Sequence, residues 1–170
     1  YSGNDAATAI AEYVGGSEEA FVNMMNRRAQ ELMANGTHFM NPHGLHDDNH
    51  YTTAYDLYLI FNECIKHEDF VNIIQSEAYT AYYTDVDGNS QEALFTPTNL
   101  YAQGEVDVPE NVTIVGGKTG TTDEAGYCLI LMEKDSSDNP YISIVMGASE
   151  KPVLYEDMTS LIEAIPSGQQ

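Results

Sequence analysis

The chain has 170 residues, a length that suits one domain with a single hydrophobic core. Hydrophobic residues make up 42% of the sequence, which is enough to build such a core and argues against a disordered chain. Asp and Glu number 27 against 6 Lys and Arg, so the formal net charge is -21. This charge excludes partners that are themselves polyanions, such as nucleic acids and anionic membrane surfaces.

The first half, residues 1–77, is expected to be mainly helical. Residues Asp5–Val14 form an apolar-rich segment that ends at a glycine pair. Ser17 has the character of a helix N-cap, because glutamates follow it in the turn where the helix dipole favours negative charge. Another helix starts from a capping box at residues 53–56 and carries an apolar face. A short helix over Asp69–Gln75 completes this half.

The second half, residues 78–170, is expected to contain mainly strands and one C-terminal helix. Short runs of β-branched, aromatic and other apolar residues alternate there with turn signals. The expected strands are Tyr79–Thr84, Gln91–Thr96, Val112–Val115, Tyr127–Met132 and Tyr141–Met146. Helices followed by strands and then one last helix indicate an α+β fold, in contrast to the alternating elements of an α/β fold.

A glycine-rich run over residues 116–122 directly follows one of these strands and contains Lys118. A lysine with hydroxyl groups beside it, in a backbone freed by glycines, can bind a carboxylate or a phosphate. The run lacks the spacing of a Walker-type phosphate loop. A glycine-rich turn with an exposed lysine explains the same residues, so the run alone leaves both interpretations open.

The tripeptide Ser2-Gly3-Asn4 places a hydroxyl and an amide two residues apart, just before a predicted helix. A serine can relay a proton, and an asparagine can hold a substrate amide. The same residues also form an ordinary helix N-cap, so two interpretations stay open here as well.

Four of the 5 histidines lie in one short stretch, at positions 38, 43, 46 and 50. Imidazoles with neighbouring aspartates can bind zinc, and a zinc hydrolase built on the cluster from His38 to His50 is therefore one alternative function. The spacing does not match the His-Glu-x-x-His pattern, and a turn around Pro42 interrupts any helix on which the ligands could align. We expect no metal site.

Taken together and in this order, Ser2-Gly3-Asn4 and Lys118-Thr119-Gly120 resemble the second and third motifs of the serine penicillin-binding proteins and β-lactamases. The form Ser-Gly-Asn is that of the low-molecular-mass D-alanyl-D-alanine carboxypeptidases. Further segments that agree with this family are Thr37-His38-Phe39, His43-Gly44-Leu45 and Ala125-Gly126-Tyr127. The resemblance implies a helical subdomain and part of the antiparallel sheet of a transpeptidase-like domain.

The resemblance also implies a role for each motif residue. Ser2 would relay a proton, and Asn4 would contact the substrate amide. Lys118 would attract the terminal carboxylate of a D-alanyl substrate. The substrate-binding residues would be Thr119, Gly120 and Thr121. The backbone N–H of Thr121 would form one half of the oxyanion hole, which stabilises the charge of a tetrahedral intermediate.

The first motif of the family, Ser-x-x-Lys, is not found in the chain. It carries the nucleophile and the lysine that helps to activate it. The residues three positions before the four lysines are Glu63, Val115, Leu131 and Ala148. The chain therefore resembles the C-terminal part of a catalytic domain, and we expect it to self-associate or to pair with the N-terminal segment through an uncovered apolar face.

The resemblance implies that the parent protein is a serine-type D-Ala-D-Ala carboxypeptidase. Such an enzyme removes the terminal D-alanine of peptidoglycan stem peptides through an acyl-enzyme, needs no cofactor, and is acylated by β-lactams. Its place would be extracytoplasmic. Besides the zinc hydrolase, one alternative stays open, a non-catalytic module that binds peptidoglycan peptides.

The 170-residue chain by itself is expected to be inactive, because it lacks the nucleophile. After incubation with a fluorescent penicillin, a denaturing gel should show no covalent band at the mass of the chain. A covalent band at that mass would refute the expectation.

Overall fold

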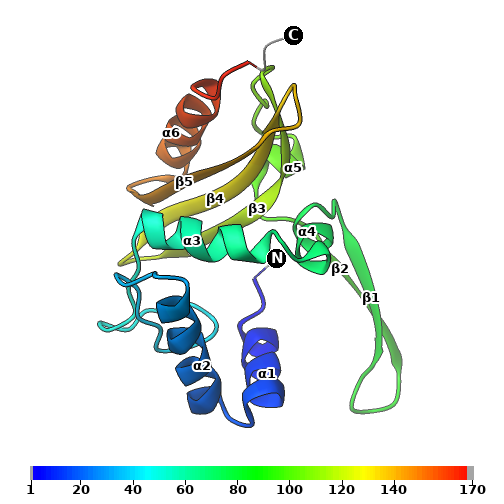
Figure 1. The fold of residues 1–170 in the computed structure, drawn as a ribbon. Coiled ribbons are helices and arrows are strands. Elements are labelled where there is room, and N and C mark those ends of the chain that lie inside the picture. The colour runs from blue at the N-terminus through cyan, green and yellow to red at the C-terminus, as the bar shows by residue number, and fades with distance from the viewer. Residues whose placement is uncertain (1, 168–170) are drawn as a thin grey trace.

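The computed structural model describes residues 2–167 and arranges the helices and the main sheet in layers (Figure 1). The helices before the first strand are α1 (Asn4–Gly15), α2 (Glu18–Glu31), α3 (Ala54–Cys64) and α4 (Glu68–Ile74). The later elements are β1 (Tyr79–Thr84), β2 (Ser90–Phe95), α5 (Leu100–Gln103), β3 (Val112–Thr122), β4 (Gly126–Asp135), β5 (Pro140–Ala148) and α6 (Lys151–Glu163). The predicted α+β fold is confirmed.

Side-chain caps define where several helices begin. The Ser17 hydroxyl accepts a hydrogen bond from the Ala20 N–H at 3.1 Å, and the Thr53 hydroxyl accepts one from the Asp56 N–H at 3.1 Å. Both caps satisfy N–H groups that the first turn leaves without a partner, as the sequence predicts. Helix α5 was missed, since its 4 residues are too few to show a helical period.

The main sheet has the order β3-β4-β5 and is antiparallel throughout. Strand β3 runs on to Thr122, whereas the sequence predicts a strand that ends at Val115. The glycine-rich run is therefore part of the strand and not a turn. A register shift between Ile114 and Gly116 interrupts the ladder just before it, and Lys118 then pairs with Ile130 of β4.

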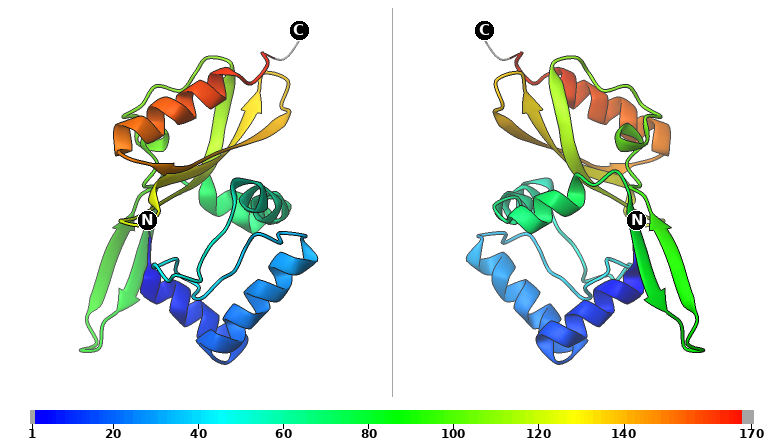
Figure 2. Two further views of the ribbon diagram at one scale, coloured as in Figure 1. Left: turned by 90° about the vertical axis from the view of Figure 1, so that its left-hand side faces the viewer. Right: turned by 90° about the vertical axis from the view of Figure 1, so that its right-hand side faces the viewer.

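Helix α6 covers one face of this sheet (Figure 2). Its contact residues Met158 and Ile162 are fully buried, and they pack against Leu129 and Leu131 of β4. These strand residues are two apart, so their side chains point to the same face of the sheet. Tyr101 of α5 belongs to the same core and packs edge to face on Tyr155 at 5.4 Å between ring centroids.

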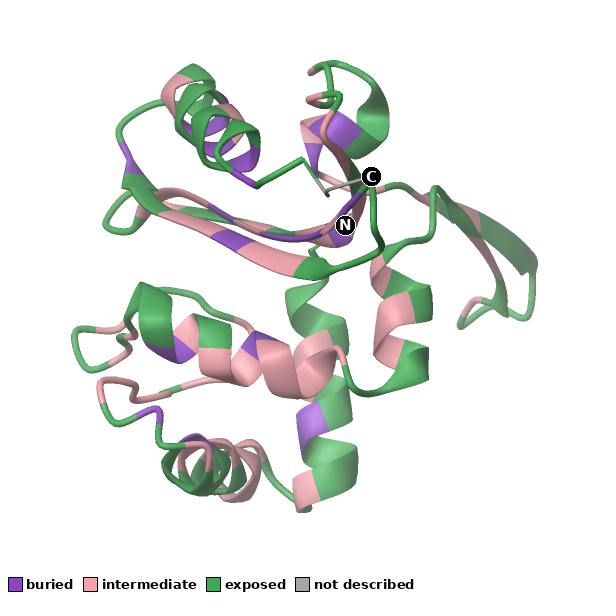
Figure 3. Ribbon diagram, turned by 45° about the horizontal axis from the view of Figure 1, so that its top comes forward, coloured by how far each residue is buried: buried purple, intermediate pink, exposed green. Residues whose placement is uncertain are grey.

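The opposite face of the sheet is covered by the helical part of the chain. Helix α3 packs against β5, and α4 packs against β3. Phe61 of α3 meets Phe70 of α4 in an edge-to-face contact at 5.6 Å. Burial is patchy in the helical part, where exposed and half-buried residues alternate along α1 and α2 (Figure 3). The largest fully buried side chains lie at the sheet and α6, which is the better packed side.

Glu133 is a carboxyl group buried in the sheet core. It follows Leu129 and Leu131 on the α6 face of β4, and its exposed fraction is 0%. Neither carboxyl oxygen has a hydrogen-bond partner among residues 2–167, although Ser143 lies beside the group. Loss of water raises the pKa of Glu133 from 4.5 to about 8, and Ser143 offsets only part of this rise. The carboxyl is therefore neutral in the folded chain at neutral pH.

This burial makes stability depend on pH. The unfolded chain releases the Glu133 proton near pH 4.5, but the folded chain holds it up to about pH 8. The free energy of unfolding should thus fall by up to about 1.4 kcal/mol per pH unit over this window, and level off above it. Denaturant unfolding at several pH values measures the effect.

A Glu133→Gln variant isolates the contribution of this group, since glutamine has nearly the same side-chain shape as glutamic acid but does not titrate. The free energy of unfolding of the variant, relative to wild type, should increase steadily from pH 4.5 to 8. Glu156→Gln, which changes an exposed carboxylate of α6, should show no such trend. An equal pH profile for wild type and Glu133→Gln would contradict the assignment.

Candidate active site

Lys118 and Ser2 lie 116 positions apart in the chain and meet in space. The Lys118 ammonium donates a hydrogen bond to the Ser2 hydroxyl at 2.7 Å. It also donates to the backbone carbonyl of Thr119. The two sequence motifs therefore lie beside each other in space.

Two glycines let strand β3 bring Lys118 to this position. A Cβ atom built on Gly117 would stand 2.0 Å from the carbonyl oxygen of Ile130 on β4. One built on Gly116 would stand 2.1 Å from the carbonyl oxygen of Ile74, at the end of α4. No real Cβ contact is this short, so only glycine allows β3 to approach β4 and α4 so closely.

The start of α1 decides between the two interpretations of Ser2-Gly3-Asn4. The N-cap residue of α1 is Gly3, and no side chain caps this helix. The Ser2 hydroxyl is directed to Lys118 instead. Asn4 is exposed at the first position of the helix, and its amide has no hydrogen-bond partner within residues 2–167. The N-cap interpretation is therefore wrong for this chain, and both polar groups are available to a substrate.

Thr119 has a partner that the sequence did not reveal. Its hydroxyl shares a hydrogen bond of 2.5 Å with the hydroxyl of Thr98, in the segment between β2 and α5. Thr98 directly precedes the buried Asn99, which caps α5. No periodicity or motif connects positions 98 and 119, so only the fold could pair them.

The rest of the glycine-rich run is open. Gly120 and Thr121 are exposed, and a Cβ atom built on Gly120 would meet no atom within 4 Å. Thr122 closes the run, where its hydroxyl accepts a hydrogen bond from the Ala125 N–H at 3.0 Å. The end of the strand beyond Lys118 thus leaves room for another molecule.

A cavity of about 390 Å³ lies beside Lys118. Its lining residues are Phe70, Ile73, Ile74, Ser76, Ala78, Tyr79, Phe95, Thr96, Pro97, Thr98, Gly117 and Lys118. The lining is mostly apolar with a few hydroxyl groups, and Lys118 contributes its positive charge. This is the usual composition of a small-molecule site.

The charge of Lys118 is not neutralised within the described part of the chain. None of its carboxylates lies within salt-bridge distance of the Lys118 ammonium. Surrounding protein removes water from the ammonium and lowers the pKa of Lys118. Lys118 is exposed as a residue and only partly desolvated at its ammonium, so a cation without a counterion is accessible to an anionic ligand even in a chain of charge -21.

The four clustered histidines have separate partners. His38 contacts the Asn49 carbonyl at 2.7 Å, His43 lies 3.8 Å from Glu18, and His46 lies 3.3 Å from Asp48. His50 accepts a hydrogen bond from the Met40 N–H at 3.1 Å, and desolvation lowers its pKa. Within residues 2–167, no three His, Cys, Asp or Glu side chains come together as metal ligands. The structure gives no support to the zinc alternative.

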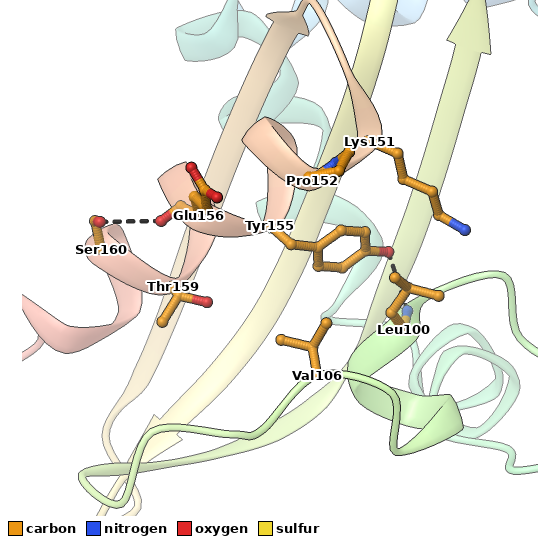
Figure 4. Close-up of a pocket in the computed structure, with 8 residues that line it drawn as sticks. All are labelled: Leu100, Val106, Lys151, Pro152, Tyr155, Glu156, Thr159 and Ser160. Carbon is orange, nitrogen blue, oxygen red and sulfur yellow. Dashed lines mark hydrogen bonds between the residues drawn. The ribbon is translucent and has the colours of Figure 1, made fainter.

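A second cavity, of about 630 Å³, lies between α6 and the segment around α5 (Figure 4). Its lining includes Leu100, Val106 and Tyr155, and the Tyr155 hydroxyl accepts a hydrogen bond from the Leu100 N–H at 3.0 Å. No residue of the two motifs lines this cavity. The candidate site is therefore the cavity at Lys118.

Comparison with known families shows which family the chain belongs to. A family model described as D-alanyl-D-alanine carboxypeptidase matches residues 1–150, which include both motifs. The chain belongs to this family. Within the D-alanyl-D-alanine carboxypeptidase family, the chain is 34% identical over 162 residues to D-alanyl-D-alanine carboxypeptidase DacF of Bacillus subtilis. The match covers 95% of the chain and 39% of DacF.

Other relatives give the same result. D-alanyl-D-alanine carboxypeptidase DacC of Escherichia coli is 30% identical over 161 residues, which are 95% of the chain and 37% of DacC. The crystal structure of the Streptomyces K15 DD-transpeptidase superposes with a TM-score of 0.82 at 26% identity, over 93% of the chain and 60% of the transpeptidase. The chain thus spans about two fifths of the length of these curated carboxypeptidases.

No helix within residues 2–167 combines the length and the apolar character that crossing a bilayer requires.

The ammonium of Lys118 should titrate below the ordinary lysine value of about 10.4, because it is desolvated. A pH titration by NMR with isotope-labelled lysine side chains measures this. Ser2→Ala should lower the pKa of Lys118 further, since the charged form loses a hydrogen-bond acceptor. A titration of Lys118 at or above the ordinary value would contradict the assigned desolvation.

Proposed function

We propose that this chain supplies the second and third motifs of a serine D-Ala-D-Ala carboxypeptidase. The reaction removes the terminal D-alanine of a peptidoglycan stem peptide through an acyl-enzyme. The observation that carries the proposal is the hydrogen bond of 2.7 Å between Lys118 and Ser2, since it joins the two motifs in space. Lys118 also lines the cavity. Membership of the carboxypeptidase family supports the choice of substrate.

Lys118 binds the terminal carboxylate of the stem peptide. Its ammonium has no carboxylate partner in the described chain, and it borders a cavity of suitable size. A local cation of this kind is needed, because the overall charge of -21 repels an anionic peptide. The hydroxyl of Thr119 adds a polar group next to it and is oriented by Thr98.

Ser2 relays a proton from the nucleophilic serine, which gives it up on forming the acyl-enzyme, to the amine of the leaving D-alanine. Its oxygen accepts a hydrogen bond from Lys118, which leaves the hydroxyl hydrogen free to point at the amine of the leaving group. Asn4 lies two residues on, exposed and without a partner among residues 2–167, and binds the amide of the substrate. The backbone N–H of Thr121 forms half of the oxyanion hole, beside the open space at Gly120.

The nucleophile of this reaction is a serine of a Ser-x-x-Lys motif, which none of the four lysines of the chain provides. The acyl-enzyme therefore forms on a residue outside residues 1–170, and this chain contributes binding, charge and proton transfer. β-Lactams acylate the same nucleophile. The reaction needs no cofactor and takes place outside the cytoplasmic membrane, where peptidoglycan is located.

A chimera with Bacillus subtilis DacF tests this proposal. The aligned residues of DacF are replaced with residues of this chain, so that DacF supplies the remaining sequence. The chimera should become labelled by fluorescent penicillin and release D-alanine from a D-Ala-D-Ala peptide. Lys118→Ala should lower kcat/KM at least about 100-fold, since the loss of one preorganised charge contact costs this much in other enzymes.

Lys66→Ala is the matched control in the chimera. Lys66 is an exposed lysine paired with Glu63 at 2.8 Å, away from the cavity, and its loss should change kcat/KM less than about twofold. Circular dichroism confirms that each variant is folded. A folded chimera without activity, or equal losses for Lys118→Ala and Lys66→Ala, would refute the proposal.

A further inference from the structure

Strands β1 and β2 form a hairpin that projects from the body of the molecule and adjoins it at its base (Figures 1 and 2). The hairpin exposes an unusual amount of aromatic surface. Tyr79, Tyr82 and Tyr83 are 66%, 77% and 53% exposed. Exposed aromatic groups that are clustered on one element indicate a binding surface more often than scattered ones do.

The register of the hairpin sorts these tyrosines onto two faces. Residues directly opposite each other in an antiparallel pair point to the same face. Tyr79 pairs with Phe95 and Tyr83 pairs with Gln91, so they share a face, which we call the cavity face. The cavity face consists of Tyr79, Ala81, Tyr83, Gln91, Ala93 and Phe95. Tyr82 pairs with Glu92 and points to the other face.

The cavity face begins at the candidate active site. Tyr79 and Phe95, at the base of the hairpin, line the same cavity as Lys118. From there the face runs outward past two alanines to Tyr83, which is about 13 Å from Tyr79 along an extended strand. A ligand held at Lys118 can therefore continue along the cavity face without leaving the protein surface.

The charges of the hairpin restrict the kind of ligand. Residues 79–95 contain no Lys or Arg, and the six residues of the cavity face carry no charge. The hairpin carboxylates are Asp85 and Asp87 in the turn and Glu92 on the other face. Polyanionic and lipid-headgroup ligands are therefore disfavoured, and an uncharged ligand with apolar flat surfaces is favoured.

We propose that the cavity face binds the uncharged glycan strand to which the stem peptide is attached. Sugar rings present C–H faces that stack on exposed tyrosine rings, and their hydroxyl and acetamido groups remain in water or meet the tyrosine hydroxyls. The alanines between Tyr79 and Tyr83 keep the surface flat enough for such rings. The identity of the polymer rests on the proposed function, since the peptide at Lys118 is what ties the glycan to this face.

Binding to isolated glycan strands tests the proposal on the 170-residue chain. Glycan strands freed of stem peptides, with their lactyl carboxyl groups converted to amides so that they stay uncharged, are titrated into the protein and followed by NMR and calorimetry. Saturable binding is expected, with chemical-shift changes confined to the cavity face. Tyr79→Ala and Tyr83→Ala should each weaken binding about fivefold or more, whereas Tyr82→Ala, on the other face, should change it less than twofold.

Tyr83→Phe separates ring stacking from folding, since it keeps the ring and removes only the hydroxyl. It should retain most of the affinity, and thermal unfolding should show all variants folded. Absence of saturable binding, equal losses for Tyr82→Ala and Tyr83→Ala, or binding of an apolar peptide in place of the glycan would overturn the proposal.

The two proposals can fail separately. Glycan binding together with an inactive DacF chimera would refute only the proposed function. An active chimera without glycan binding would refute only this inference.

Discussion

The hydrogen bond between Lys118 and Ser2 is the contact on which the site depends. It joins a residue in the middle of β3 to a residue just before α1, across 116 positions of sequence. It can form only if β3 lies close to β4 and α4, and Gly116 and Gly117 permit that approach.

Strand β3 is supported on one edge by β4, on which α6 packs. Met158 and Ile162 pack on Leu129 and Leu131 of β4, which pair with Thr119 and Gly117 of β3. The segment between β2 and α5 supports β3 at its other edge, through the bond between Thr98 and Thr119. Site geometry and core packing are thus coupled, because the strand that carries Lys118 is also part of the sheet that α6 covers.

Charge is distributed in a way that suits a small anionic ligand. The chain carries a formal charge of -21, and most of this charge is spread over the exposed surface. Lys118 has no carboxylate partner in the described part of the chain and is partly shielded from water, so its positive potential is strong but short in range. Glu133, whose pKa is strongly raised, is neutral and lies on the α6 face of the sheet, where it does not oppose Lys118.

The sequence by itself determined much of the local structure. The caps at Ser17 and Thr53 and the α+β order follow from residue types and spacing, which are local signals, whereas Ser2, Asn4 and Lys118 were chosen because their motifs resemble those of a known family. Only the tertiary structure decided that the glycine run is strand, that Thr98 binds Thr119, and that Tyr79 and Tyr83 share a face leading from Lys118. These features depend on register and on contacts between distant segments, which single-sequence periodicity does not contain.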